Sequence, residues 1–140
     1  MPLGAFISSK EIMNSLIHNP VLGHITTFGG HPVSCATGMA ALEILAGSDL
    51  IKGVREKEQL FISLLTHKKI KEFRSKGLLI ALEFETETEN KRIISLCIEK
   101  GVIVDWFLFN SRSMRIAPPL TITEEEIKQA CKIILRSMDE

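Results

Sequence analysis

The sequence HITTFGGHPVSCATGMAALEIL, residues 24–45, joins a turn rich in hydroxyl groups and glycine to a long apolar run. Pro32 fits the first turn of a helix, where its missing N–H group breaks no hydrogen bond. Apolar residues at helical spacing follow it on one face: Val33, Ala36, Ala40 and Ile44. The stretch therefore predicts a loop over residues 26–30 that leads directly into a helix from Pro32.

The loop carries groups that suit an anion. Thr26 and Thr27 supply hydroxyl donors, and the glycine pair at 29–30 allows the backbone to approach a ligand closely. The N-terminus of the following helix adds partial positive charge, so phosphate or carboxylate is the favoured ligand. A Gly-Gly pair before a helix is also common in ordinary turns. From these residues alone, the anion site and the simple turn both stay open.

Length, composition and charge limit the class of protein. The chain has 140 residues, of which 45% are hydrophobic and 24% charged, enough for one ordinary core. Seventeen basic residues balance seventeen acidic ones, which argues against nucleic acid or an anionic membrane as a partner. No apolar run reaches the roughly 18 residues of a membrane helix, and no signal segment opens the sequence. A cytoplasmic location is expected.

Histidine and cysteine form no recognisable metal or nucleophile motif. Three cysteines without CxxC or metal-type spacing lie in apolar helical contexts, and we expect them to be reduced core residues: Cys35, Cys97 and Cys131. His24 and His31 are seven positions apart with no third ligand, so no metal site is predicted. Ser34 lies on the expected helix rather than on a sharp strand-to-helix turn, so it is not predicted to be a nucleophile.

The remainder of the chain alternates helical and strand patterns. The Gly-Ser-Asp sequence at 47–49 is suited to cap a helix that continues to Leu65. The elements expected after it are a strand over 77–85, a helix over 89–101 closed by Gly101, strands over 102–109 and 114–119, and a helix opened by a capping box of Thr123 and Glu126. This order predicts an α/β fold in which the small α+β domain has helices on one face of a short sheet.

Arg115 stands inside an apolar strand pattern, between Met114 and Ile116. Strand alternation places it on the face opposite to these two neighbours. Two alternatives stay open for this residue. It is either a solvated side chain on an exposed sheet face or a guanidinium that binds a substrate carboxylate through two parallel hydrogen bonds.

Three stretches, in this order and at this spacing, resemble the class III pyridoxal-phosphate aminotransferases, the group that contains ornithine, acetylornithine and 4-aminobutyrate aminotransferases. They are MPLGAFISS at 1–9, HITTFGGHPVSCATGMAALEIL at 24–45 and MRIAPPLTITEEEI at 114–127, with KGLLIALEF at 76–84 similar to the family's usual strand. The resemblance covers essentially the whole chain and implies the C-terminal part of a fold type I transferase. Residues 1–46 would be a remnant of the large PLP-binding domain with its connecting helix, and residues 47–140 the small domain.

The resemblance also implies roles for particular residues. The family's threonine before Phe/Tyr-Gly-Gly bonds the phosphate of pyridoxal 5'-phosphate in the neighbouring subunit's active site, and here that residue is Thr27. Thr26 and Phe28 beside it become cofactor-binding candidates, and a homodimer is implied. The arginine before Ile/Leu-x-Pro-Pro binds the substrate α-carboxylate, and here that residue is Arg115. Amino acids and 2-oxo acids are the substrates that follow.

Two departures from the family pattern lie in the loop, and a third concerns the catalytic lysine. His31 stands where asparagine is usual, and Ile25 where glycine is common. The family's Schiff-base lysine belongs to a Lys-Gly-x-Gly-Gly-Gly segment directly before MPLGAF, and no lysine of this chain matches it. Lys10, the nearest, lies in what we expect to be an exposed helix entry.

We therefore expect the 140 residues to be an inactive C-terminal fragment of an aminotransferase. The parent enzyme would move an amino group from a donor of the ornithine, acetylornithine or ω-amino-acid type to a 2-oxo acid. A non-catalytic α+β module with a regulatory or protein-interaction role is the alternative.

Overall fold

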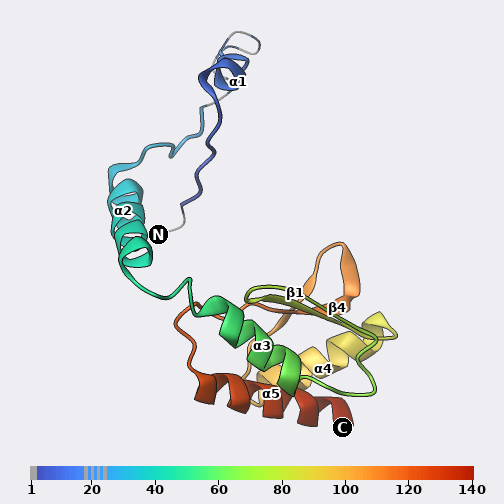
Figure 1. The fold of residues 1–140 in the computed structure, drawn as a ribbon. Helices are drawn as coiled ribbons and strands as arrows, with labels where there is room; N and C mark the ends of the chain where they lie inside the picture. The colour runs from blue at the N-terminus through green and yellow to red at the C-terminus, as the bar shows by residue number, and fades with distance from the viewer. Residues whose placement is uncertain (1–2, 18, 20, 22, 24) are drawn as a thin grey trace. The chain divides into compact units, whose positions relative to one another are not determined.

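The computed structural model describes residues 3–17, 19, 21, 23 and 25–140, which divide into two compact units, Met1–Ser48 and Asp49–Glu140 (Figure 1). Within these described residues, no helix combines the length and the apolar character needed to cross a bilayer.

Among its described residues, the first unit contains two helices, α1 (Lys10–Asn14) and α2 (Pro32–Gly47). The N-terminus of α1 is capped by Ser9, whose hydroxyl accepts a hydrogen bond of 3.3 Å from the Ile12 backbone N–H. Helix α2 begins at Pro32, as the sequence predicts. Residues 3–9 form neither a helix nor a strand.

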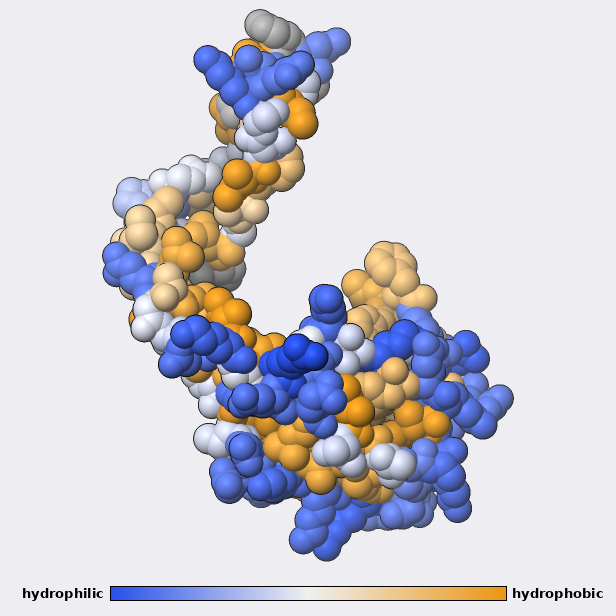
Figure 2. Space-filling model, viewed as in Figure 1, coloured by the Kyte–Doolittle hydropathy of each residue, from blue (hydrophilic) through white to orange (hydrophobic). Residues whose placement is uncertain are grey.

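The surface of the first unit is unusually apolar. Helix α2 has hydrophobic residues on all sides, a pattern typical of helices that are buried in a larger protein. None of the described residues of this unit is buried, and Figure 2 shows hydrophobic side chains gathered over α2. The exposed residues of α2 include Val33, Met39, Leu42 and Ile44.

The second unit is built on a four-stranded antiparallel sheet in the order β1-β2-β4-β3. The strands are β1 (Glu72–Lys76), β2 (Leu79–Glu83), β3 (Asp105–Phe107) and β4 (Asn110–Ile116). Gly77 turns the chain between β1 and β2 with φ +59°, a left-handed conformation that favours glycine. Leu82 pairs with Met114 in the register of β2 and β4.

Three helices lie on one side of this sheet: α3 (Val54–Leu64), α4 (Glu87–Glu99) and α5 (Glu124–Asp139) (Figure 1). The mixed α/β architecture confirms the expected fold class. Gly101 follows α4 with φ +87°, and Thr123 and Glu126 form the predicted capping box of α5. The expected cap at 47–49 is wrong, because Gly53 is the N-cap of α3. The Asp49 carboxylate pairs instead with Lys52 at 2.6 Å.

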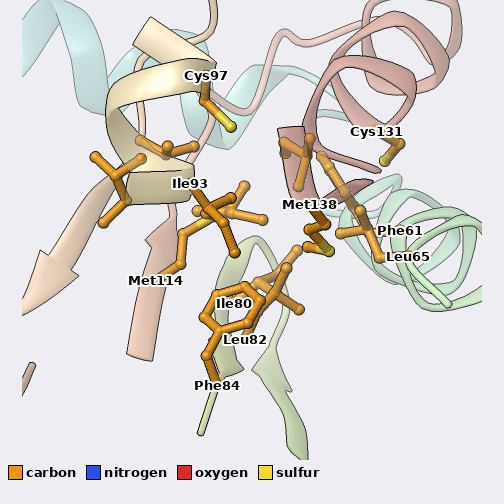
Figure 3. Packing of buried hydrophobic residues seen from close by; sticks show 14 of the residues in the cluster. Phe61, Leu65, Ile80, Leu82, Phe84, Ile93, Cys97, Met114, Cys131 and Met138 are labelled. Carbon is orange, nitrogen blue, oxygen red and sulfur yellow. The ribbon is translucent and has the colours of Figure 1, made fainter. Parts of the chain in front are cut away.

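The hydrophobic core of the second unit lies between the sheet and the three helices (Figure 3). The largest fully buried hydrophobic side chains come from every helix and from the two central strands: Phe61, Ile80, Leu82, Ile93, Met114, Ile127, Ile134 and Met138. Phe84, just after β2, completes this set. The alternation of β2 and β4 that turns Leu82 and Met114 into the core turns Ala81 and Arg115 to the other face.

Two of the three cysteines are core residues, as predicted. Cys97 and Cys131 are buried, and burial raises the pKa of both thiols, that of Cys131 to about 12. The prediction is wrong for Cys35, which is exposed on α2. The apolar surroundings in sequence indicated burial, but nothing in the described part of the first unit covers this side of α2.

Candidate functional site

The threonine and glycine loop forms a tight turn directly before α2. The Gly29 N–H donates to the Thr26 carbonyl at 3.1 Å, and the His31 N–H donates to the Phe28 carbonyl at 3.2 Å. Gly30 has φ +72°, a conformation that side-chain-bearing residues rarely adopt. These bonds and this glycine let the chain reverse direction and enter the helix at Pro32.

The Thr26 side chain packs directly over Gly29. A β-carbon added at Gly29 would lie 2.7 Å from Thr26 Oγ1, so a larger residue there would require the Thr26 side chain to shift. Neither threonine hydroxyl of the turn forms a hydrogen bond with another described residue. Thr26 and Thr27 are both exposed, so their hydroxyl groups are accessible to a ligand.

The N-terminus of α2 lies immediately beside this turn. His31 occupies the N-cap position but makes no capping hydrogen bond through its side chain. Its ring packs edge-to-face with that of Phe28, with centroids 6.5 Å apart. A helix start without a side-chain cap keeps its first N–H groups available for an anion. The hydroxyls, the close glycine and the helix start are groups suited to a phosphate, and anion binding by this turn stays a prediction.

Arg115 lies in β4, on the sheet face opposite to the core. Its neighbours across the sheet are Ala81 on β2 and Asp105 on β3. Arg115 Nη2 donates to Asp105 Oδ2 at 2.6 Å, and both side chains are a little under half exposed. The structure leaves both alternatives for Arg115 open, a solvated side chain and a guanidinium that binds a substrate carboxylate. It shows a guanidinium held by a neighbouring carboxylate.

A second polar cluster on this face was not found from the sequence. The Glu83 carboxylate accepts hydrogen bonds from Arg74 at 2.8 Å, Arg112 at 2.9 Å and Asn110 at 3.1 Å. Hydrogen bonds from Arg74 and then Asn110 are the main reasons that the pKa of Glu83 is lowered from its usual value. Sequence patterning gives no signal for this cluster, because its members come together only through the strand register.

The predicted site residues fall into both units of the structure. Thr26, Thr27 and Phe28 lie together in one turn of the first unit, whereas Arg115 belongs to the second. His24, the first residue of the motif and half of the histidine pair considered for metal binding, lies outside the described residues. In the part of the chain that is described, no three His, Cys, Asp or Glu side chains group closely enough to hold a metal ion.

Comparison with known protein families gives one match over nearly the whole sequence. The family model described as aminotransferase class-III matches residues 1–138. This match includes both the turn before α2 and the strand that carries Arg115.

Solved structures with the same fold are longer proteins. Ornithine aminotransferase from Toxoplasma gondii, in a structure with PLP at partial occupancy in its active site, is 30% identical with a TM-score of 0.76. That similarity covers 91% of this chain and 30% of the other. Acetylornithine aminotransferase from Elizabethkingia anophelis is also 30% identical, with a TM-score of 0.71, covering 82% of this chain and 32% of the other.

A third solved structure shows similarity of fold alone. The adenosylmethionine-8-amino-7-oxononanoate aminotransferase from Methanocaldococcus jannaschii is 23% identical, with a TM-score of 0.78. The similarity covers 94% of this chain and 34% of the other. The 140 residues thus span about a third of the length of these neighbours.

Proposed function

Because the chain belongs to the class III aminotransferases, a family of PLP-dependent enzymes, we propose that it supplies the phosphate-binding turn and the carboxylate-binding arginine of such an enzyme. The observation that carries the proposal is the turn at 26–30. Two accessible threonine hydroxyls and an uncapped helix start lie together there, in a sequence that matches the family from residue 1 to residue 138.

PLP, when bound, withdraws electrons from the amino-acid substrate so that its amino group can be transferred. The residues of this chain act by binding and orientation. The Thr27 hydroxyl would donate a hydrogen bond to the cofactor phosphate, in the site of a second subunit of a homodimer. Thr26 lies against Gly29, and its carbonyl accepts the Gly29 N–H hydrogen bond that closes the turn. Phe28, whose ring packs edge-to-face with that of His31, would contribute to holding the cofactor.

Arg115 binds the α-carboxylate of the amino donor. A guanidinium presents parallel N–H groups that match the two oxygens of a carboxylate. We propose that the donor is an amino acid of the ornithine, acetylornithine or ω-amino type and the acceptor a 2-oxo acid, in the cytoplasm. A donor with an α-carboxylate agrees best with Arg115.

We propose that the Schiff-base lysine of the enzyme is not among residues 1–140. No lysine in the sequence lies in a segment like Lys-Gly-x-Gly-Gly-Gly, and Lys10 is an exposed residue at the start of α1. We propose that residues 1–46 belong to the PLP-binding domain with its connecting helix and residues 47–140 to the small domain. On their own, the 140 residues are expected to be inactive.

The test compares variants in the complete enzyme. Thr27→Ala is expected to raise the Kd for PLP about tenfold, since one hydrogen bond to a charged phosphate is lost. Thr27→Ser keeps the hydroxyl and is expected to retain most of the affinity. Arg115→Ala is expected to raise the KM for the amino donor, whereas Arg55→Ala, an exposed arginine on α3, leaves it unchanged. A complete protein that binds no PLP would refute the proposal and favour the non-catalytic module.

A further inference from the structure

We propose that Asp105 is a positioning residue that holds the guanidinium of Arg115 in one direction, so that its remaining N–H groups meet an incoming carboxylate. The inference deepens the proposed function, on which it rests. Asp105 lies on the neighbouring strand, and a backbone N–H group of that strand holds its carboxylate in place.

Each oxygen of the Asp105 carboxylate accepts a hydrogen bond from a different donor. Oδ2 accepts the hydrogen bond of 2.6 Å from Arg115 Nη2. Oδ1 accepts a hydrogen bond of 2.8 Å from the backbone N–H of Trp106. The carboxylate is therefore fixed to β3 at one oxygen and holds Arg115 with the other. Asp105 and Arg115 are also direct partners in the strand register, so their side chains are adjacent on one face of the sheet.

The contact with Asp105 leaves most of the guanidinium available. An arginine side chain has five N–H donors. Among the described residues, the Arg115 side chain donates one hydrogen bond, to Asp105. On its other side, the partner across the sheet is Ala81, which has no side-chain acceptor. Enough donors remain for a carboxylate to bind by two parallel hydrogen bonds while Asp105 stays in place.

The Asp105 carboxylate has two opposing effects on an incoming anion. It repels the anion, but the side chains of Arg115 and Asp105 are 43% and 44% exposed, so water and salt screen that repulsion. It also removes rotamer freedom that a flexible arginine would otherwise lose on binding. Solvent screens the repulsion between Asp105 and the anion, but it does not reduce the entropy cost of ordering Arg115. The orientation of Arg115 by Asp105 therefore favours anion binding more than the repulsion opposes it.

The test uses the purified 140-residue chain labelled with ¹⁵N-arginine, titrated with sodium acetate at constant ionic strength. The readout is the NMR signal of the Arg115 side-chain Nε–H group. Asparagine has a single side-chain acceptor oxygen and cannot keep both hydrogen bonds of Asp105. In Asp105→Asn, the Arg115 signal is expected to show faster side-chain motion and a Kd for acetate that rises roughly threefold to tenfold, as part of the rotamer freedom of arginine is restored.

Two further variants separate positioning from a general effect of charge or folding. Asp49→Asn removes the same charge from another exposed ion pair, that with Lys52, and is expected to leave the Arg115 signal and its Kd for acetate unchanged. Asp105→Glu keeps the carboxylate and is expected to restore part of the affinity. An unchanged or tighter Kd for acetate in Asp105→Asn would overturn the inference, as would unchanged motion of the Arg115 side chain.

The inference and the proposed function can fail separately. In the complete enzyme, Asp105→Asn is expected to raise the KM for the amino donor with little change in kcat, because orientation of Arg115 affects donor binding. If the complete protein shows no transamination, the function is refuted, while the acetate titration still decides whether Asp105 positions Arg115. If transamination is present but the KM is unaffected, the inference is overturned and the function stands.

Discussion

The carboxylate of Glu83 on β2 accepts a hydrogen bond of 2.8 Å from the guanidinium of Arg74 on β1. Arg112 and Asn110 on β4 donate to the same carboxylate. One side chain thus connects three of the four strands on the face opposite to the core. This arrangement holds together the strand that carries Arg115, and its charge makes the stability of the sheet depend on pH.

The lowered pKa of Glu83 determines the direction of that dependence. The folded chain favours the ionised carboxylate, so the stabilisation is fully present above the unfolded pKa of about 4.3 and is lost as the pH falls through the lower folded value. Glu83→Gln is expected to lower the free energy of unfolding at pH 7 and to flatten its dependence between pH 5 and pH 3. Urea unfolding at several pH values measures this. Glu99→Gln, a change at an exposed glutamate of α4, is the control, and an equal effect in both variants would contradict the role of Glu83.

The capping box of α5 gives a prediction about helix stability. Thr123 accepts a hydrogen bond from the Glu126 N–H at 3.2 Å, and Glu126 accepts one from the Thr123 N–H at 2.8 Å. Thr123→Ala is expected to lower the free energy of unfolding by about 1 kcal/mol. Thr121→Ala, two residues earlier and also exposed, is expected to change it by less than about 0.5 kcal/mol. Equal losses in urea unfolding would show that the box does not stabilise the helix.

The core predicts a contrast between two isoleucines. Ile134 on α5 is fully buried, whereas Ile103 is 91% exposed. Ile134→Ala is expected to cost about 2–5 kcal/mol, because it removes buried methyl groups and leaves a cavity. Ile103→Ala is expected to cost less than about 0.5 kcal/mol. Thermal or urea unfolding of the two variants measures the difference. Similar losses in the free energy of unfolding would contradict the burial of Ile134 in the core.

The cysteines predict a pattern of chemical reactivity. Only the thiolate reacts readily, and burial raises the pKa of Cys97 and Cys131 while also blocking access. Cys35 is exposed. Mass spectrometry after brief treatment of the native chain with iodoacetamide at pH 8 is expected to find label on Cys35, and label on all three after unfolding. Rapid labelling of Cys131 in the native chain would contradict the described core.

Much of the fold follows from local patterns in the sequence. Pro32, Gly101 and the pair Thr123 and Glu126 mark helix ends that the structure confirms, because proline geometry, a left-handed glycine and a capping box act over one helical turn. The sequence pattern does not predict strand β1, EFRSK. It contains one aromatic residue among polar ones, and its strand conformation comes from pairing with β2 rather than from its own apolar pattern.

The candidate site was predictable in part. Thr26 and Thr27 lie in a sequence whose hydroxyls and glycines indicate an anion, and the structure places both in one turn directly before α2, where anion binding stays a prediction. The partner of Arg115 was not predictable. Asp105 is ten positions away and reaches Arg115 only because the pairing of β3 with β4 sets them opposite each other. Register of this kind depends on the whole sheet rather than on a local motif.

The most direct test is an absorption titration with PLP, performed on the 140-residue chain and on the chain extended upstream through the Lys-Gly-x-Gly-Gly-Gly segment that we propose. The account predicts that the extended chain gains a saturable visible band and transfers amino groups from an amino-acid donor, that Thr27→Ala weakens the titration, and that the 140 residues alone show no turnover. An extended chain without the band, or turnover by the 140 residues alone, would contradict it.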